Sequence, residues 1–302
     1  MTLLLFIEQL INGLQFGLML FLMAVGVTLV FGVMRVINLA HGSMFMVGGY
    51  FLVAAYSATR SYALALPLAI TGVVAVAVVM ELLVLRPLYG REPLDQVLAT
   101  FGMTMFFNEA VVVIWGREPL SFAIPPLLNG YVQILPGISY PVFRLTISGV
   151  AIVVGLLLYL FIAHTRLGAL IRAGSESREK REIVAALGVN IGFLYTLVFA
   201  LGAALAGLAG MMTGPLLSVE PGIGDPILIL TLVVIVIGGF GSIRGALAGA
   251  LIVGVFDTFS RVLVPQLFGL SASSALTGMA VYILMAAILI YSRTGLFTPQ
   301  RG

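Results

Sequence analysis

Hydrophobic residues run along this chain in long segments that are separated by short polar stretches. An apolar run of about 20 residues crosses a bilayer as a helix, and long runs without strict alternation favour helices over strands. Because lipid offers backbone groups no water to bond, such runs predict a helical membrane bundle. Nine hydrophobic segments are expected, at about 6–31, 38–58, 62–84, 96–115, 143–163, 191–213, 227–240, 245–264 and 273–291.

The seventh of these segments is short and ends in glycines. We therefore predict an all-α, polytopic transmembrane bundle of about eight or nine spans, with one broken or re-entrant helix near 227–245. Residues 1–302 are expected to form a single transmembrane domain. No lysine or arginine precedes Arg35, so the first segment lacks the basic region of a signal peptide, and we expect it to be retained.

The composition agrees with a membrane protein. The chain is 61% hydrophobic and 9% charged, and its mean hydropathy is +1.18. Soluble domains carry about a quarter charged residues, so this chain could not cover a water-exposed surface. The absence of cysteine excludes disulfides and thiolate chemistry.

Basic residues predict the orientation. The most charged loop, 164–190, contains Lys180, the only lysine. If this loop is cytoplasmic, eleven of the fifteen basic residues lie inside, as the positive-inside rule favours. The eleven are Arg35, Arg86, Arg91, Arg166, Arg172, Arg178, Lys180, Arg181, Arg244, Arg293 and Arg301. The N-terminus is then outside, the C-terminus inside, and 116–142 is the longest outer loop.

Small residues recur at intervals of four along several segments, as at Gly13 and Gly17 and at Gly202, Ala206 and Gly210. Residues at this spacing share one helix face and let helices approach closely. Two interpretations stay open, tight packing within the subunit and a backbone-lined pathway or subunit interface.

A few polar residues lie within the hydrophobic segments. Asp257 and Arg261 are four apart and are predicted to pair along one helix. For Asn108 and Glu109, a packing hydrogen bond and a pathway role stay open. The two histidines have no nearby carboxylate cluster, so no metal site is expected.

The charged stretch "RAGSESREKREIVAALGVN", residues 172–190, has a pattern of its own. Ser175 or Ser177 can cap a helix that begins near 178, and Gly188 can end it. A short amphipathic helix of this kind suits docking into a partner's groove, and a solvated loop is the alternative. Phosphate-cradling loops need Gly-Lys-Ser/Thr, which is absent around Lys180, so we expect no ATPase site and no enzymatic activity in this chain.

Four stretches resemble the permease subunits of branched-chain amino acid ABC transporters. They are "GLMLFLMAVGVTLVFGVMRVINLAHGSMFMVGGY" (17–50), "VLATFGMTMFFNEAVVVIWG" (97–116), "TRLGALIRAGSESREKREIVAALGVNI" (165–191) and "VVIVIGGFGSIRGALAGALIVGV" (233–255). The first and last suggest the first of the family's two paired permease types.

The resemblance implies an importer of branched-chain or similar apolar amino acids in the bacterial inner membrane. The implied partners are a second homologous permease, two cytoplasmic ATPase subunits that bind ATP and magnesium, a periplasmic binding protein and the bilayer. The chain itself would need no cofactor and no nucleic acid. Urea, amides and aromatic acids stay open as substrates, as does a homodimer instead of a heterodimer.

The resemblance also implies two sets of site residues. Coupling to the ATPase, through the loop 164–190, is expected at Arg172, Arg178, Glu179, Ala186 and Gly188. The translocation pathway or gate is expected at Asn38, His41, Ser43, Gly238, Gly239, Gly241 and Ser242. The alternative function is a secondary transporter or channel-like facilitator of a small polar or amphipathic solute, which would need no docking helix. An intramembrane enzyme would need a catalytic set that the sequence does not present.

Overall fold

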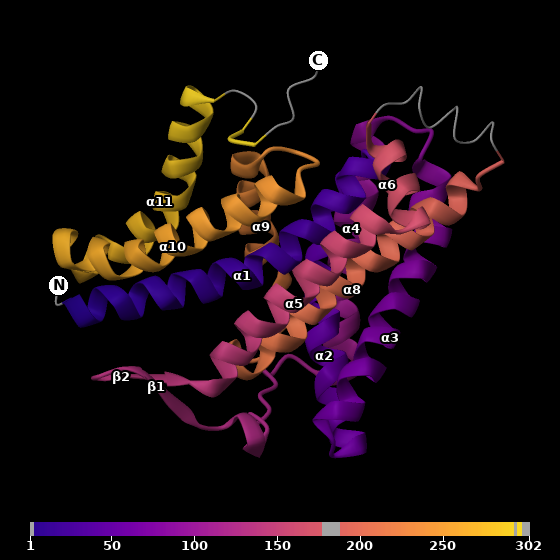
Figure 1. Cartoon of the computed structure of the whole chain (residues 1–302). Helices are drawn as coiled ribbons and strands as arrows, with labels where there is room; N and C mark the ends of the chain where they lie inside the picture. The colour runs from indigo at the N-terminus through magenta and orange to yellow at the C-terminus, as the bar shows by residue number, and fades with distance from the viewer. Residues whose placement is uncertain (1–2, 177–187, 293–294, 298–302) are drawn as a thin grey trace. The chain divides into compact units, whose positions relative to one another are not determined.

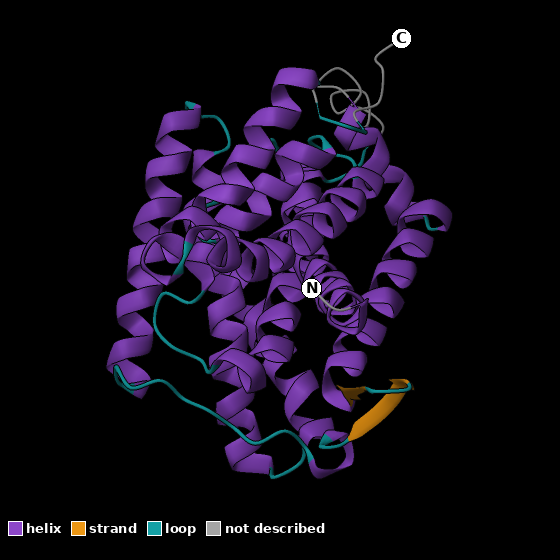
Figure 2. Ribbon diagram, turned by 90° about the vertical axis from the view of Figure 1, so that its left-hand side faces the viewer, coloured by secondary structure: helices purple, strands orange, loops and turns teal. Residues whose placement is uncertain are grey.

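The computed structural model describes residues 3–176, 188–292 and 295–297, and these are mostly helical (Figure 2). The main helices are α1 (Leu3–Met34), α2 (His41–Thr59), α3 (Tyr62–Met80), α4 (Pro93–Trp115), α5 (Val142–His164), α6 (Arg166–Glu176), α8 (Ile191–Leu217), α9 (Gly224–Gly238), α10 (Ile243–Phe268) and α11 (Leu270–Tyr291). Three short turns are η1 (Glu81–Leu85), which is π-helical, η2 (Arg86–Leu88) and η3 (Pro126–Leu128).

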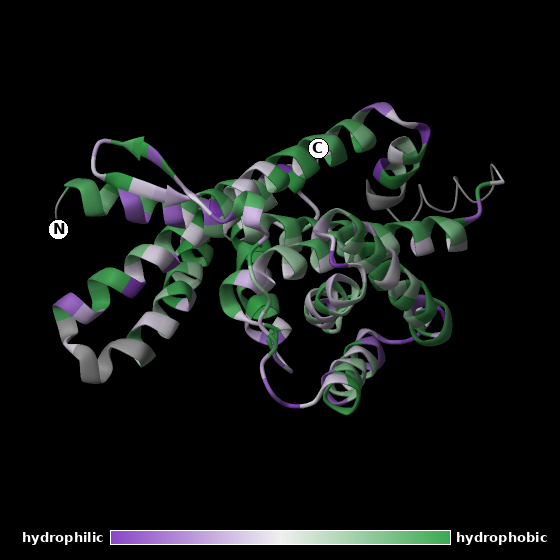
Figure 3. Cartoon of the chain, turned by 90° about the horizontal axis from the view of Figure 1, so that it is seen from below, coloured by the Kyte–Doolittle hydropathy of each residue, from purple (hydrophilic) through white to green (hydrophobic). Residues whose placement is uncertain are grey.

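Each of the nine predicted hydrophobic segments lies on a helix, so the polytopic helical class is confirmed. Six of the described helical stretches are long and apolar enough to cross a membrane. They are Leu3–Met34, Tyr62–Leu88, Pro93–Trp115, Val142–His164, Ile191–Leu217 and Ile243–Leu267. Shorter apolar helices cover Gly224–Gly238 and Ala275–Tyr291. Figure 3 shows the hydrophobic colouring that dominates these helices.

The region near 227–245 contains two separate helices, and neither is broken within this region. Helix α9 ends at Gly238 and α10 begins at Ile243. Between them, Gly239 and Gly241 have φ of +99° and +78°, a left-handed conformation that glycine adopts without steric cost. The chain therefore leaves one helix and enters the next through a turn that only these glycines accommodate freely.

One element of the predicted outer loop was not expected from the sequence. Strands β1 (Tyr131–Leu135) and β2 (Ile138–Pro141) form an antiparallel hairpin, drawn in orange in Figure 2. Gly137 takes the left-handed conformation at the turn, with φ of +91°. The all-α description therefore needs this small exception.

The chain divides into two compact units. The first unit comprises Met1–Ala24, Ile124–Val153 and Ile229–Gly302. In this unit α1 and α10 lie side by side (Figure 1). A Cβ added to Gly13 would lie 2.7 Å from the Val255 Cα, and one added to Gly17 would lie 2.7 Å from the Ala250 carbonyl oxygen. The predicted glycine pair is therefore a packing surface.

The second unit comprises Val25–Ala123 and Val154–Leu228. Here α2 crosses α8 at very close range, with Gly48 against Gly207 and the Gly210 Cα beside the Phe45 carbonyl. A side chain at Gly48 or Gly210 would overlap the facing backbone, and one at Gly207 would crowd the Val73 side chain of α3. The small-residue stripe of α8 is thus buried inside the subunit, in favour of the packing interpretation.

Candidate functional site

The predicted pathway residues of the second unit gather at the start of α2. Asn38, His41 and Ser43 are all buried, with at most 4% of each residue exposed. Asn38 closes the turn before the helix, because its Oδ1 accepts the Ala40 N–H at 3.0 Å. Among the described residues, no hydrogen-bond partner reaches Asn38 Nδ2 or Ser43 Oγ. This helix start therefore holds buried polar groups in an otherwise apolar interior.

Glycines make the room for this helix start. A Cβ on Gly26 of α1 would lie 2.8 Å from His41 Nε2, so the imidazole occupies the space that the missing side chain leaves. A Cβ on Gly42 would lie 2.7 Å from the carbonyl oxygen of Gly224, the first residue of α9. Glycines on the neighbouring helices therefore leave the space that the start of α2 occupies.

Thr100 on α4 holds the loop that precedes α2. Its hydroxyl accepts the Leu39 N–H at 3.2 Å, and the residue is completely buried. Buried backbone N–H groups need a partner, so this hydroxyl fixes the path of the loop. Sequence reasoning missed Thr100, although a hydroxyl at the second turn of a hydrophobic segment was a visible signal.

The other predicted pathway residues belong to the first unit. Gly238 packs against Gly245 across the α9–α10 turn, and Ser242 caps α10 by accepting the Gly245 N–H at 3.0 Å. The chain near its end binds the same turn. The Leu296 N–H donates to the Ile237 carbonyl at 2.9 Å, and the Phe297 N–H donates to the Gly238 carbonyl at 3.2 Å. These bonds satisfy two of the last carbonyls of α9.

The structure therefore assembles the predicted pathway residues as two local groups, one in each unit. Asn38, His41 and Ser43 share one helix start. Gly238, Gly239, Gly241 and Ser242 share one turn.

The predicted coupling residues are described only in part. Arg172 is exposed on α6, and Gly188 forms a turn with φ of +85°. Arg178, Glu179 and Ala186 lie outside the described residues, as does the predicted helix start near 178. A helix that the sequence did not predict, α6, begins earlier, at Arg166, and Ser175 lies within it. The Thr165 hydroxyl accepts the Gly168 N–H at 2.9 Å and so caps the beginning of α6.

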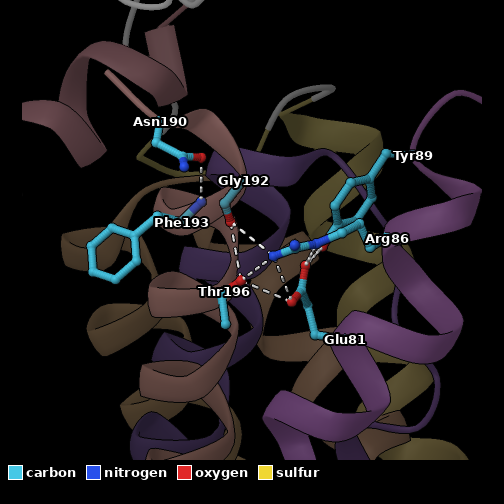
Figure 4. Close-up of polar contacts among 7 residues, drawn as sticks. All are labelled: Glu81, Arg86, Tyr89, Asn190, Gly192, Phe193 and Thr196. Atoms are coloured by element: carbon cyan, nitrogen blue, oxygen red, sulfur yellow. Dashed lines mark hydrogen bonds and ion pairs between the residues drawn. The ribbon is translucent and has the colours of Figure 1, made fainter. Parts of the chain in front are cut away.

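A polar network joins the end of α3 to the beginning of α8 (Figure 4). The Glu81 carboxylate is completely buried and lies 3.3 Å from Arg86 Nε. It also accepts hydrogen bonds from the hydroxyls of Tyr89, at 2.6 Å, and Thr196, at 2.8 Å. Arg86 Nη2 in turn donates to Thr196 Oγ1 at 2.7 Å. We call Glu81, Arg86, Tyr89 and Thr196 the α3–α8 network.

A local change of helix geometry creates this network. In a regular α-helix, residues five apart are separated by about 140° around the axis and face different directions. The π-helical turn η1 replaces i→i+4 bonds with i→i+5 bonds, and the Arg86 N–H donates to the Glu81 carbonyl. This turn brings residues five apart toward the same side of the helix, and Arg86 reaches the Glu81 carboxylate.

Tyr89 strengthens the network as a permanent donor. Burial, followed by the hydrogen bond to the Glu81 carboxylate, raises the pKa of the Tyr89 phenol above its ordinary value. The hydroxyl therefore keeps its proton at physiological pH. The Tyr89 ring also meets the edge of Tyr195 on α8, with ring centroids 5.0 Å apart.

Other polar residues find partners close by. Asp257 and Arg261 pair along α10 at 2.7 Å, which confirms the predicted ion pair. Asn108 donates to the Asp225 carboxylate at 3.2 Å, so it joins α4 to the first turn of α9. This bond supports the packing interpretation of Asn108.

The second unit has two distinct ends. At one end, Gln96 donates to the carbonyls of Leu88 and Arg91. The α3–α8 network binds the first turns of α8 at the same end. At the opposite end, Leu120 and Val219 exchange backbone hydrogen bonds. A 19-residue helix such as α2 spans about 28 Å, enough to separate these ends by nearly the thickness of the hydrocarbon core.

Comparison with known proteins agrees with this architecture. The family model described as "Branched-chain amino acid transport system / permease component" matches residues 9–292. The high-affinity branched-chain amino acid transport system permease protein BraD of Pseudomonas aeruginosa is 30% identical, over 96% of this chain and 95% of that protein. The corresponding permease protein LivH of Escherichia coli is 29% identical, over 94% of this chain and 95% of that protein.

A third relative is the probable branched-chain amino acid transport permease protein LivH of Methanocaldococcus jannaschii. It is 27% identical, over 93% of this chain and 87% of that protein. No solved structure matches the chain at a significant level. The match of the family model to nearly the whole chain, together with these relatives, shows that the chain belongs to the permease components of branched-chain amino acid transport systems.

Proposed function

We propose that this chain is a permease subunit of an ATP-driven importer that moves branched-chain or similar apolar amino acids into the cytoplasm. The observation that carries the proposal is the family match over residues 9–292. The proposed assembly contains a second homologous permease, two cytoplasmic ATPase subunits and a substrate-binding protein. ATP and magnesium are bound by the ATPase subunits, because this sequence has no phosphate-binding loop of its own.

The proposed contact with the ATPase is the loop 164–190, with Arg172, Arg178, Glu179, Ala186 and Gly188 as coupling residues. Exposure of Arg172 and the turn at Gly188 support this role. Helix α6 packs against α8, with Ile171 buried, so a force on the loop has a direct path into a membrane helix. Closure of the ATPase pair would displace this loop and tilt the helices between inward-facing and outward-facing states.

The proposed orientation has the N-terminus outside and the C-terminus inside the cytoplasmic membrane. Its support is the charge difference between the two ends of the second unit. Arg35, Arg86 and Arg91 lie toward the end that also holds Gly188, whereas Arg60 and Arg117 lie toward the other. The positive-inside rule favours the first end as cytoplasmic.

The proposed pathway passes the start of α2. An apolar amino acid needs hydrophobic walls and a few polar groups for its ammonium and carboxylate. Asn38 Nδ2 and Ser43 Oγ are buried donors, and both lie at a helix N-terminus, which favours negative charge. His41 lies between them in sequence. The turn of Gly238, Gly239, Gly241 and Ser242 is proposed as a gate, since its backbone can change direction without steric cost.

Uptake by a reconstituted complex tests the proposed function. The chain is expressed with the ATPase, the second permease and the binding protein of the proposed assembly, and leucine uptake is followed in vesicles. Uptake should require ATP and be insensitive to an uncoupler. Uptake that survives ATP depletion and collapses with the uncoupler would establish a secondary transporter instead. Co-purification of an ATPase with this chain gives a second, independent measurement.

Two substitutions test the coupling assignment within that complex. Arg172→Glu and Gly188→Glu place bulky acidic residues at the proposed contact. Each should uncouple ATP hydrolysis from uptake or prevent the ATPase from binding. If both variants still hydrolyse ATP in step with uptake, the coupling surface lies elsewhere.

A further inference from the structure

The beginning of α8 is where the chain leaves the loop 164–190. Gly188 forms the turn, and Asn190 caps the helix by accepting the Phe193 N–H at 3.0 Å (Figure 4). Gly192 follows Gly188 by four positions, and a fully extended chain of that length spans about 14 Å at most. Displacement of the loop must therefore act within a short distance on the first turns of α8.

The α3–α8 network holds these first turns. Arg86 Nη2 donates to Thr196 Oγ1 at 2.7 Å, and Thr196 Oγ1 donates to Glu81 Oε2 at 2.8 Å. A longer hydrogen bond, at 3.5 Å, joins Arg86 Nη2 to the Gly192 carbonyl. Both of these short hydrogen bonds thus end at a single hydroxyl, that of Thr196.

The two links differ in burial, because only their Glu81 end is shielded from water. The Glu81 side chain is completely buried, whereas 43% of the Arg86 side chain is exposed. Burying a carboxylate costs free energy unless it is paired and hydrogen-bonded. Separating it from its partners while it stays buried is strongly unfavourable. Loop displacement is therefore expected to carry α3 along with α8 rather than separate them.

We propose that the α3–α8 network is a positioning element of the transport cycle, which makes α3 and α8 move as one body when the ATPase displaces the loop 164–190. This inference rests on the proposed function. Thr196 is the decisive residue, because both short cross-helix bonds end at its hydroxyl. Glu81, Arg86 and Tyr89 hold that hydroxyl in place and are positioning residues as well.

The test compares Thr196→Val with Thr213→Val in the complete complex. Valine keeps nearly the shape of threonine but removes the hydroxyl. Thr213 lies on the same helix and is buried, and its hydroxyl donates only to the Ala209 carbonyl, at 2.7 Å, among the described residues. It is therefore a matched control that leaves the α3–α8 network intact.

The measured quantity is the number of leucine molecules taken up per ATP hydrolysed, at equal amounts of assembled complex. We expect Thr196→Val to lower this ratio about fivefold, the lower end of the coupling factors between linked sites in proteins. ATP hydrolysis and binding of the substrate-binding protein should persist. Thr213→Val should keep the ratio of the unsubstituted complex.

Three results would distinguish the alternatives. An unchanged ratio in Thr196→Val overturns the proposal, and so does an equal fall in both valine variants. Uptake that never depends on ATP in the unsubstituted complex refutes the proposed function itself. If Thr196→Val does not assemble, Tyr89→Phe removes a single donor to Glu81 and is judged by the same ratio, with a smaller fall expected.

Discussion

The close crossing of α2 and α8 makes a quantitative prediction for Gly210→Ala. The Gly210 Cα lies beside the Phe45 carbonyl, and an added methyl group would overlap that backbone atom. The two helices cannot move apart locally, because Gly48 of α2 and Gly207 of α8 are in similarly close contact one turn away. Overpacking of this kind costs about 1–3 kcal/mol. For domains of this size, each kcal/mol lowers the melting temperature by about 2–4 °C, so we expect a fall of roughly 2–12 °C.

Thermal unfolding of the purified protein in detergent measures this effect, with Gly102→Ala as the control. Gly102 lies inside α4, where an added Cβ would meet no atom within 4 Å. There, alanine should leave the melting temperature unchanged or raise it, because it loses less conformational freedom than glycine, by about 0.5–1 kcal/mol. If Gly210→Ala melts at the same temperature as Gly102→Ala, the described contact between α2 and α8 is incorrect.

Two further predictions concern hydrogen bonding and orientation. Thr100→Val leaves the Leu39 N–H without its partner and should cost about 1–3 kcal/mol, measured as a lower melting temperature; unchanged stability would show that the loop does not depend on this hydroxyl. Because the chain has no cysteine, single variants report sidedness directly. A thiol reagent that cannot cross membranes should label Arg117→Cys in intact cells and Arg91→Cys only after permeabilisation, and the reverse pattern would invert the orientation.

Hydrophobic pattern alone predicted where the long apolar helices lie. The reason is physical: a segment such as 143–163 is long and apolar enough that a membrane helix is the only structure that satisfies its backbone. The turn after the short apolar run at 227–240 was also predictable, because that run ends in glycines. By contrast, the hairpin at 131–141 was not predicted, because it depends on pairing between two strands. Helix α6 was not predicted either, because it begins at Arg166, before the charged stretch in which a helix start near 178 was expected.

The candidate site was predictable only as two sequence-local groups. Asn38, His41 and Ser43 are near one another in sequence, and a helix start keeps them together. The α3–α8 network was missed for a different reason. Glu81 and Arg86 would face different sides of a regular helix, and only a π-helical turn aligns them. Thr196 is more than one hundred residues away, so no helical periodicity could connect it to Glu81.

Two ion pairs among the described residues show why geometry decides their roles. Asp257 and Arg261 are four residues apart on α10, so their bond stabilises a single helix and transmits nothing to a neighbour. Glu81 and Arg86 also belong to one stretch of chain, but both bind the same hydroxyl on α8. A buried ion pair rarely adds net stability over apolar side chains of similar volume. The Glu81–Arg86 pair lies where the loop 164–190 leads into α8. Its position is therefore better explained by the connection that it makes between α3 and α8 than by a gain in folding stability.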